Sequence, residues 1–150
     1  SYFYALRNQG TFKGSLTDDL DACVPLEIKN PQPTVYLGWQ MSHLKPFLEQ
    51  HYSVIDLTSD YKKEVQITNL NGIFGGELAG ALIPEAKLID GAALAFVARE
   101  AGFLVTTLNG SDIPPIYTCQ DYCLPELIIA TSPAIHQNLL EAVAYCESHF

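Results

Sequence analysis

From Thr34 onward, short apolar runs of strand length alternate with segments that carry helix signals, and this alternation constrains the fold more than any other feature of the chain. The predicted strands lie at 34–40, 52–57, 78–83, 103–108 and 127–130. Such an order is typical of α/β proteins, in which helices pack on a sheet. We therefore predict an α/β domain over residues 31–150, with a mostly parallel or mixed sheet flanked by helices.

Two of the intervening helices have clear boundaries. One is predicted to begin at Asp90 and to end at Gly102, with apolar residues at three- and four-residue spacing between them. The other has Ser132 as its N-cap and Pro133 at its first position, where a missing N–H costs little. A shorter helix is predicted from Ser42 to about residue 50.

The segment 61–74 carries a weaker pattern. Its apolar residues have helical spacing, and Ser59 or Asp60 is placed to cap a helix there, but 65–67 also alternates like a strand. We predict a helix for this segment and keep a strand as the alternative.

The first fourteen residues alternate like two strands broken at Asn8-Gln9-Gly10, so a β-hairpin is predicted at the start of the chain. An isolated two-stranded ribbon is marginally stable in water. We therefore interpret residues 1–30 as a hairpin and linker that remain from a missing N-terminal domain. Because unpaired strand edges invite association, we expect a dimer or a complex with the missing half rather than a free monomer.

Composition narrows the class of partner. Eight Lys and Arg stand against 17 Asp and Glu, a formal charge of −9, which repels nucleic-acid phosphates and anionic lipid surfaces. No apolar run approaches the roughly 20 residues of a membrane helix. We expect a cytoplasmic protein that binds neither nucleic acid nor membrane.

Cysteine and histidine give little sign of a site. Cys119 and Cys123 lack the second pair that a structural zinc site needs, so two reduced thiols in a loop are expected. His136 falls in the first turn of the last helix, and a surface or capping role is expected for it.

Three stretches resemble the inositol monophosphatase family of magnesium-dependent, lithium-sensitive phosphatases. They are Tyr4-Ala5 with Gly10-Thr11-Phe12-Lys13-Gly14, Asp90-Gly-Ala-Ala93 running into Arg99-Glu-Ala-Gly102, and Leu127-Ile-Ile-Ala130 with Ser132-Pro-Ala-Ile-His136. They occur in the family's order, and together they resemble its C-terminal portion. The resemblance implies the C-terminal domain of the sugar-phosphatase fold.

The resemblance also implies a cofactor. Phosphate monoester hydrolysis uses carboxylates around Mg²⁺, and the resemblance assigns one such ligand to Asp90. From the residues alone, an N-cap role for Asp90 is at least as good an interpretation. The family's other ligands, an upstream Glu and an Asp-Pro-x-Asp-Gly-Thr motif, do not occur here, so weak or absent Mg²⁺ binding is expected of this chain alone.

The substrate-binding residues are less well defined. The family's substrate-contacting Glu falls near Ile83, with Glu85 close by, and Lys87 is placed to reach an anion, although an exposed Lys is usually only solvated. The family's small-residue substrate turn aligns without gaps to residues 64–66, which do not match it. The implied ligand is a small phosphorylated metabolite, such as an inositol phosphate, a sugar phosphate or a nucleotide 3′-phosphate.

Two functions follow. The first is the C-terminal part of a Mg²⁺-dependent phosphomonoesterase that is active only when an N-terminal half completes it. The alternative is a non-catalytic binding or assembly module that retains the phosphatase fold. The altered substrate turn favours the module, and the Asp90 helix favours the enzyme.

Overall fold

The computed structural model describes residues 1–149. Ten strands are present among them: β1 Tyr2–Leu6, β2 Gly10–Gly14, β3 Val24–Pro25, β4 Thr34–Leu37, β5 Ser53–Asp56, β6 Gly80–Ile83, β7 Ala86–Lys87, β8 Leu104–Thr107, β9 Cys123–Leu124 and β10 Leu127–Ala130. The α-helices are α1 Lys45–Leu48, α2 Leu57–Asp60, α3 Gly72–Gly75, α4 Leu88–Glu100 and α5 Pro133–Ser148. Four 3₁₀ turns add to them, at Leu20–Ala22, Ser42–Leu44, Ile116–Thr118 and Gln120–Tyr122.

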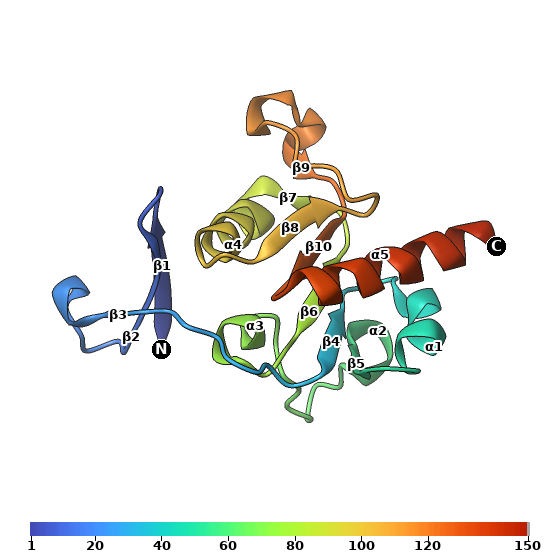
Figure 1. The fold of residues 1–150 in the computed structure, drawn as a ribbon, viewed down its shortest axis with the longest axis horizontal. Coiled ribbons are helices and arrows are strands. Elements are labelled where there is room, and N and C mark those ends of the chain that lie inside the picture. Colours follow the sequence, from blue (N-terminus) through green and yellow to red (C-terminus); the bar gives the residue numbers. More distant parts are fainter. Residues whose placement is uncertain (150) are drawn as a thin grey trace.

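A five-stranded mixed sheet forms the centre of the molecule, in the order β5-β4-β6-β10-β8 (Figure 1). β4 runs parallel to both β5 and β6, whereas β10 is antiparallel to β6 and β8. The antiparallel register places Ile128 opposite Leu82 and Thr106. The predicted fold class, a mixed sheet flanked by helices and preceded by an N-terminal hairpin, is confirmed.

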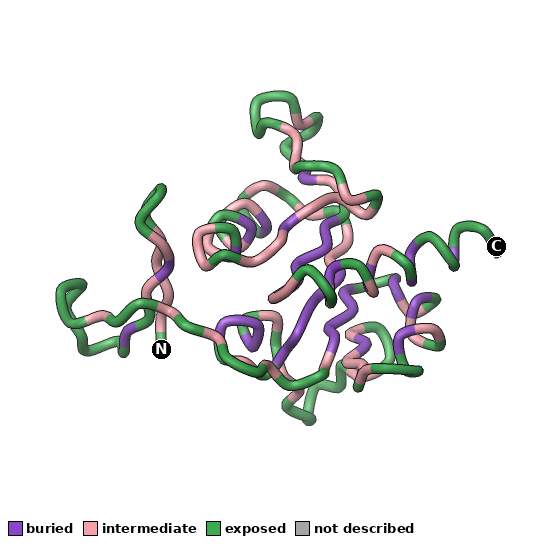
Figure 2. The backbone as a smooth tube through the Cα atoms, in the orientation of Figure 1, coloured by how far each residue is buried: buried purple, intermediate pink, exposed green. Residues whose placement is uncertain are grey.

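Each face of this sheet has its own apolar core. On one face, Leu37, Leu82 and Ile128 pack with the buried stripe of α5 and with α1. On the other face, Ala81 and Ile129 pack with residues of α3 and α4. Figure 2 shows the resulting band of buried backbone through β4, β6 and β10. Central strands with apolar residues on both sides are typical of α/β layering, because helices cover both faces.

The N-terminal strands form a separate antiparallel sheet in the order β1-β2-β3, and it packs on α4 (Figure 1). Phe3 stacks at a tilt on Phe74 of α3 with ring centroids 5.1 Å apart, and the backbone N–H of Asn8 donates to Glu100 at 3.0 Å. The hairpin was predicted from sequence, whereas the short strand β3 was not.

The sequence predicted the start of α5 correctly, but it predicted the start of α4 too late in the chain. α5 begins where predicted, and the Ser132 hydroxyl accepts a hydrogen bond from the N–H of Ile135. α4 begins at Leu88 with Lys87 as its N-cap, so Asp90 lies in the third helical position and an N-cap role for Asp90 is wrong. The helix expected from Ser42 starts as a 3₁₀ turn and becomes α-helical only over α1.

The helix predicted over 61–74 is absent from 61–71, and only residues 72–74 are helical, as part of α3. Asp56 caps the four-residue helix α2, and the chain then runs irregularly to α3. Only an isolated bridge between Lys62 and Val65 gives any strand character to this stretch. Asp56 is the N-cap of α2 because its carboxylate accepts a hydrogen bond from the Thr58 N–H. Helix α2 therefore starts and ends earlier in the chain than the spacing of apolar residues indicated.

None of the helices described over residues 1–149 is long and apolar enough to cross a membrane.

Candidate functional site

The topology provides one place where a ligand crevice is expected. β4 and β6 are parallel neighbours, but β4 leads into α1 on one face of the sheet, while β6 leads through β7 into α4 on the other face. Connections that diverge in this way leave a gap outside the carboxyl ends of the two strands. In open α/β sheets, ligands bind in that gap.

A hollow of about 280 Å³ lies at this point. Trp39 and Gln40 line it from the end of β4, Pro84 and Glu85 from the end of β6, and Glu147 from α5. A second hollow of about 540 Å³ adjoins it and shares Glu85 and Glu147. The two together form a groove along the carboxyl edge of the sheet, and its ionised side chains are mostly carboxylates.

Close packing of the two strand ends shapes the groove. The N–H of Gly38, which directly follows β4, donates to the carbonyl of Leu82 at 2.9 Å. A Cβ atom at Gly38 would overlap the Cδ of Pro84. Glycine at this position therefore lets the end of β4 approach the β6 turn.

Glu85 is the sequence-predicted residue that this geometry places in the groove. It is exposed and lines both hollows. Lys87 lies in β7, and its ammonium donates to the carbonyl of Asp121 at 3.2 Å, so this side chain ties the β6–α4 connection to the 116–123 loop.

Asp90 lies five residues beyond Glu85 on the same connection, in the first turn of α4 and exposed. A carboxylate there interacts favourably with the helix dipole. Over residues 1–149, His, Cys, Asp and Glu form no group of three or more arranged to hold a metal ion. The carboxylate of Asp90 is a suitable oxygen ligand for Mg²⁺, but residues 1–149 do not make a complete magnesium site.

A buried acid was missed from the sequence. Asp56 ends β5 with a relative exposure of 1%, and it accepts hydrogen bonds from the Thr58 N–H at 3.1 Å and the Ser59 hydroxyl at 2.9 Å. Its own N–H donates to Asp60 at 2.8 Å. The signal was present in the sequence: an Asp at the end of a strand, followed by Leu57-Thr58-Ser59-Asp60, is a reciprocal capping pattern.

The environment of Asp56 favours its charged form. Burial acts to raise the pKa of this carboxyl, but hydrogen bonds from Ser42, Ser59 and the Thr58 amide, with the charge of Lys45, hold the pKa below its usual value. The Thr58 hydroxyl also accepts from the N–H of Gln40 at 2.9 Å. The ends of β4 and β5 are thus clamped together beside the groove. This strand-to-helix turn, rather than residues 64–66, follows the carboxyl end of β5.

His136 does not have the surface role that was expected. Its ring is buried, with Nε2 2.8 Å from the Thr106 hydroxyl, which itself donates to the Thr107 carbonyl at 2.9 Å. The ring therefore serves as the donor in this pair. Burial lowers the pKa of His136. Cys119 and Cys123 are both free, and Cys123 lies in β9 rather than in a loop.

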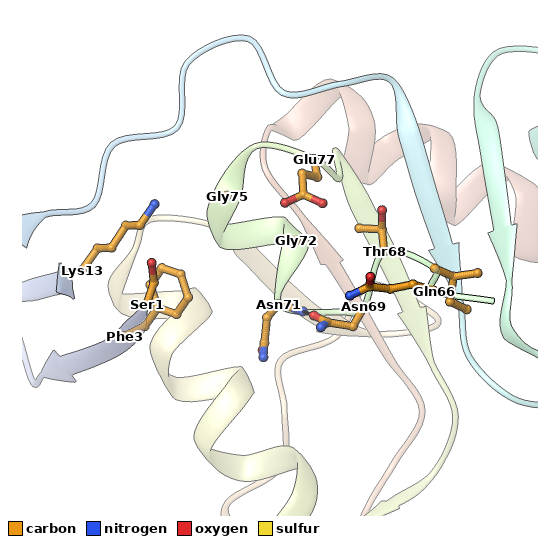
Figure 3. Close-up of a pocket in the computed structure, with 11 residues that line it drawn as sticks. Ser1, Phe3, Lys13, Gln66, Thr68, Asn69, Asn71, Gly72, Gly75 and Glu77 are labelled. Carbon is orange, nitrogen blue, oxygen red and sulfur yellow. Dashed lines mark hydrogen bonds between the residues drawn. The ribbon is translucent and has the colours of Figure 1, made fainter. Parts of the chain in front are cut away.

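A third hollow, of about 490 Å³, lies away from the carboxyl edge, between the hairpin and α3. Figure 3 shows Lys13 reaching toward it from the hairpin, with Thr68 and Asn69 on the loop before α3 and Glu77 beyond that helix. The lining combines amide and hydroxyl side chains with Lys13, Glu77 and apolar groups. None of the sequence-predicted site residues contributes to it.

This chain is similar to known proteins in structure rather than in sequence. No protein-family sequence model and no curated protein sequence matches the chain. Solved structures do. The inositol monophosphatase of Thermotoga maritima has a TM-score of 0.64 at 16% identity, over 98% of this chain and 52% of that one. The extragenic suppressor protein SuhB of Bartonella henselae has a TM-score of 0.61 at 18% identity, over 95% and 53%.

An inositol monophosphatase/NADP phosphatase solved with Mg²⁺ and phosphate has a TM-score of 0.56 at 17% identity, over 92% of this chain and 48% of that one. The resemblance read from the sequence is thereby confirmed at the level of the fold. The chain spans about half the length of the structures that it matches.

Proposed function

We propose that this chain is the C-terminal part of a Mg²⁺-dependent phosphomonoesterase, with residues 31–150 as its α/β domain and residues 1–30 as the remnant of an N-terminal domain. The observation that carries the proposal is a crevice at the β4–β6 divergence, within a fold shared with inositol monophosphatases over about half their length. The proposed substrate is a small phosphorylated metabolite: an inositol phosphate, a sugar phosphate or a nucleotide 3′-phosphate. One structure of this fold, a dual-specific inositol monophosphatase/NADP phosphatase, holds D-inositol 1-phosphate.

The role proposed for Asp90 follows from the family resemblance, since Asp90 lines neither hollow of the groove, whereas the role of Glu85 follows from its position there. Asp90 supplies one carboxylate oxygen to Mg²⁺, and the remaining ligands come from the N-terminal part. When bound, Mg²⁺ neutralises phosphate charge and acidifies a water. Glu85, at the rim of the groove, accepts hydrogen bonds from substrate hydroxyls. Lys87 reaches the anion only if it leaves the Asp121 carbonyl, so we give it the lesser, charge-neutralising role.

The test is complementation. The chain alone, and the chain mixed with the N-terminal half of an inositol monophosphatase, are assayed with D-inositol 1-phosphate and Mg²⁺. We expect turnover only in the mixture and a loss of about 100-fold or more in Asp90→Asn. Asp112→Asn, an exposed acid outside the groove, is the matched control and should keep full activity. Equal activity of the Asp90 variant and the wild type would show that Asp90 is not a metal ligand.

A second candidate function is a non-catalytic binding or assembly module. Two observations favour it: residues 1–149 hold no complete metal-ligand group, and the strand-to-helix turn after β5 is built from a capped acid rather than from small residues. A stable complex with an N-terminal half that shows no phosphatase activity would support this candidate over the enzyme.

A further inference from the structure

Two aromatic side chains in contact, Trp39 and Tyr61, lie at the rim of the groove and are called the aromatic pair below. Trp39 lines the hollow of about 280 Å³ and is 47% exposed, and Tyr61 is 57% exposed. Their rings meet nearly edge to face, with centroids 5.8 Å apart and planes at 68°. The pair therefore leaves apolar ring surface open to solvent at the edge of the sheet where α/β proteins bind ligands.

The backbone on either side of Trp39 is fixed. Gln40 has a φ of 65°, in the left-handed region that residues other than glycine seldom adopt. Its N–H donates to the Thr58 hydroxyl at 2.9 Å, while the N–H of Gly38 donates to the Leu82 carbonyl at 2.9 Å. Strained conformations persist where the surroundings impose them, and they cluster at active sites and ligand-binding sites. The ring of Trp39 is thus held in place beside the groove by contacts with two other segments.

The charges of the groove decide which part of a phosphorylated ligand it accepts. Glu85, Glu126 and Glu147 line both hollows, and over residues 1–149 no Lys or Arg lines either of them. Carboxylates repel a phosphate, so the phosphoryl group is expected outside the groove, where Asp90 also lies. The groove is then left for the uncharged leaving group of the ester, whose N–H or O–H groups donate to the carboxylates.

The aromatic pair distinguishes between leaving groups. Inositol has an oxygen on every ring carbon and therefore offers little apolar surface to an aromatic ring. The base of a nucleoside is planar, stacks well on tryptophan and tyrosine, and carries amino groups that can donate to carboxylates. Met41 and Pro84 add apolar surface to the same hollow. The lining thus suits a nucleoside better than an inositol or a simple sugar.

We propose that the aromatic pair stacks on the base of the substrate's leaving group, so that the substrate is a nucleotide 3′-phosphate rather than an inositol or sugar phosphate. Trp39 provides the stacking surface in the groove, and Tyr61 fixes the orientation of its ring. This inference rests on the proposed function, because it assigns the groove to the leaving group of a phosphomonoester. It adds the substrate class and the two residues that determine it.

The first test is a fluorescence titration of the purified chain. Trp39 is the single tryptophan, so its emission reports directly on the aromatic pair. The chain is titrated with adenosine, adenosine 3′-monophosphate, myo-inositol 1-phosphate and ribose 5-phosphate. We expect saturable quenching by the two adenosine compounds and none by the inositol or ribose phosphate.

The second test is calorimetry with adenosine, which needs no tryptophan. Trp39→Leu and Tyr61→Leu should each weaken binding about tenfold or more, while Trp39→Phe should retain most of the affinity. Tyr122→Leu is the matched control, because Tyr122 is 79% exposed and lines neither hollow. Its affinity for adenosine should equal that of the wild type.

Three results would overturn the proposal: no saturable quenching by adenosine, equal quenching by adenosine and the inositol or ribose phosphate, or the same loss of affinity in Tyr61→Leu and Tyr122→Leu. In the complementation assay, adenosine 3′-monophosphate should have a kcat/KM about tenfold above that of D-inositol 1-phosphate. The two proposals fail separately. Adenosine binding without turnover of either phosphate overturns the enzyme and leaves the stacking site standing, whereas turnover of D-inositol 1-phosphate without adenosine binding does the reverse.

Discussion

The hydroxyl of Thr11 donates a 2.7 Å hydrogen bond to the carbonyl of Val97, which joins the middle strand of the hairpin sheet to helix α4. Thr11 is only 3% exposed, so this contact lies within the packed interface between the two parts of the chain. The hairpin is thus fixed to the α/β body by a specific buried contact as well as by apolar packing.

Thr11→Val should weaken this junction. Valine keeps the shape of the side chain but has no hydroxyl, so we expect a loss of about 1 to 2 kcal/mol in the free energy of unfolding. Urea unfolding followed by circular dichroism measures it. Thr17→Val, an exposed threonine on the turn after β2, serves as the control and should change the midpoint little. Equal midpoints for Thr11→Val and the wild type would show that the bond contributes nothing.

Gly38→Ala should distort the groove. The added methyl group meets the ring of Pro84, and neither the β4 end nor the proline is free to move far, so a destabilisation of about 1 to 3 kcal/mol is expected. Gly76→Ala is an informative comparison, because its cost comes from a positive φ of 80° and not from a clash. Only the Gly38 variant should alter the fluorescence of Trp39, the single tryptophan of the chain. An unchanged Trp39 spectrum would argue against a close β4–β6 approach.

Asp56→Ala should remove the cap of α2 and leave nearby donors unpaired, at a cost of about 2 kcal/mol or more at neutral pH. The pKa of Asp56 is lowered in the folded state, so its contribution is present above the unfolded pKa of about 3.9 and is lost as pH falls through the folded pKa. The difference between variant and wild type should therefore shrink only below about pH 4. Asp56→Asn keeps the cap without the charge, and urea unfolding from pH 7 to pH 3 separates the two effects.

His136 should make the protein sensitive to mild acid. Because burial lowers the pKa of its imidazole, protonation favours the unfolded chain, so stability is full above the unfolded pKa of about 6.5 and falls as pH drops from there toward the folded pKa. His136→Gln, whose amide still donates to Thr106, should reduce the difference in unfolding midpoint between pH 7.5 and pH 5.5. The exposed His51 provides a control as His51→Gln. If both variants keep the wild-type pH dependence, another group is responsible for it.

Turns and helix starts could be predicted from the sequence, because their signals lie in a few neighbouring residues. The Asn8-Gln9-Gly10 break produced the hairpin, and Ser132-Pro133 fixed the start of α5, because turns and caps depend on a few neighbouring residues. The alternation of strand and helix patterns also identified the α/β class, and the resemblance of the quoted motifs to the inositol monophosphatase family implied the related fold. Glu85 was picked out as a candidate, although its place in the groove was not visible from its neighbours.

The tertiary structure decided what depends on contacts between distant segments. Nothing near Gly38 in the chain indicates that Pro84 lies against it, and the crevice exists only because β4 and β6 become neighbours whose connections leave on opposite faces. The same holds for His136, which is buried because Thr106 lies across from it, 30 residues away in the chain. Helix and turn signals act over a few residues, whereas burial and pairing are set by which strands meet, and that choice is made by the packing of the whole sheet.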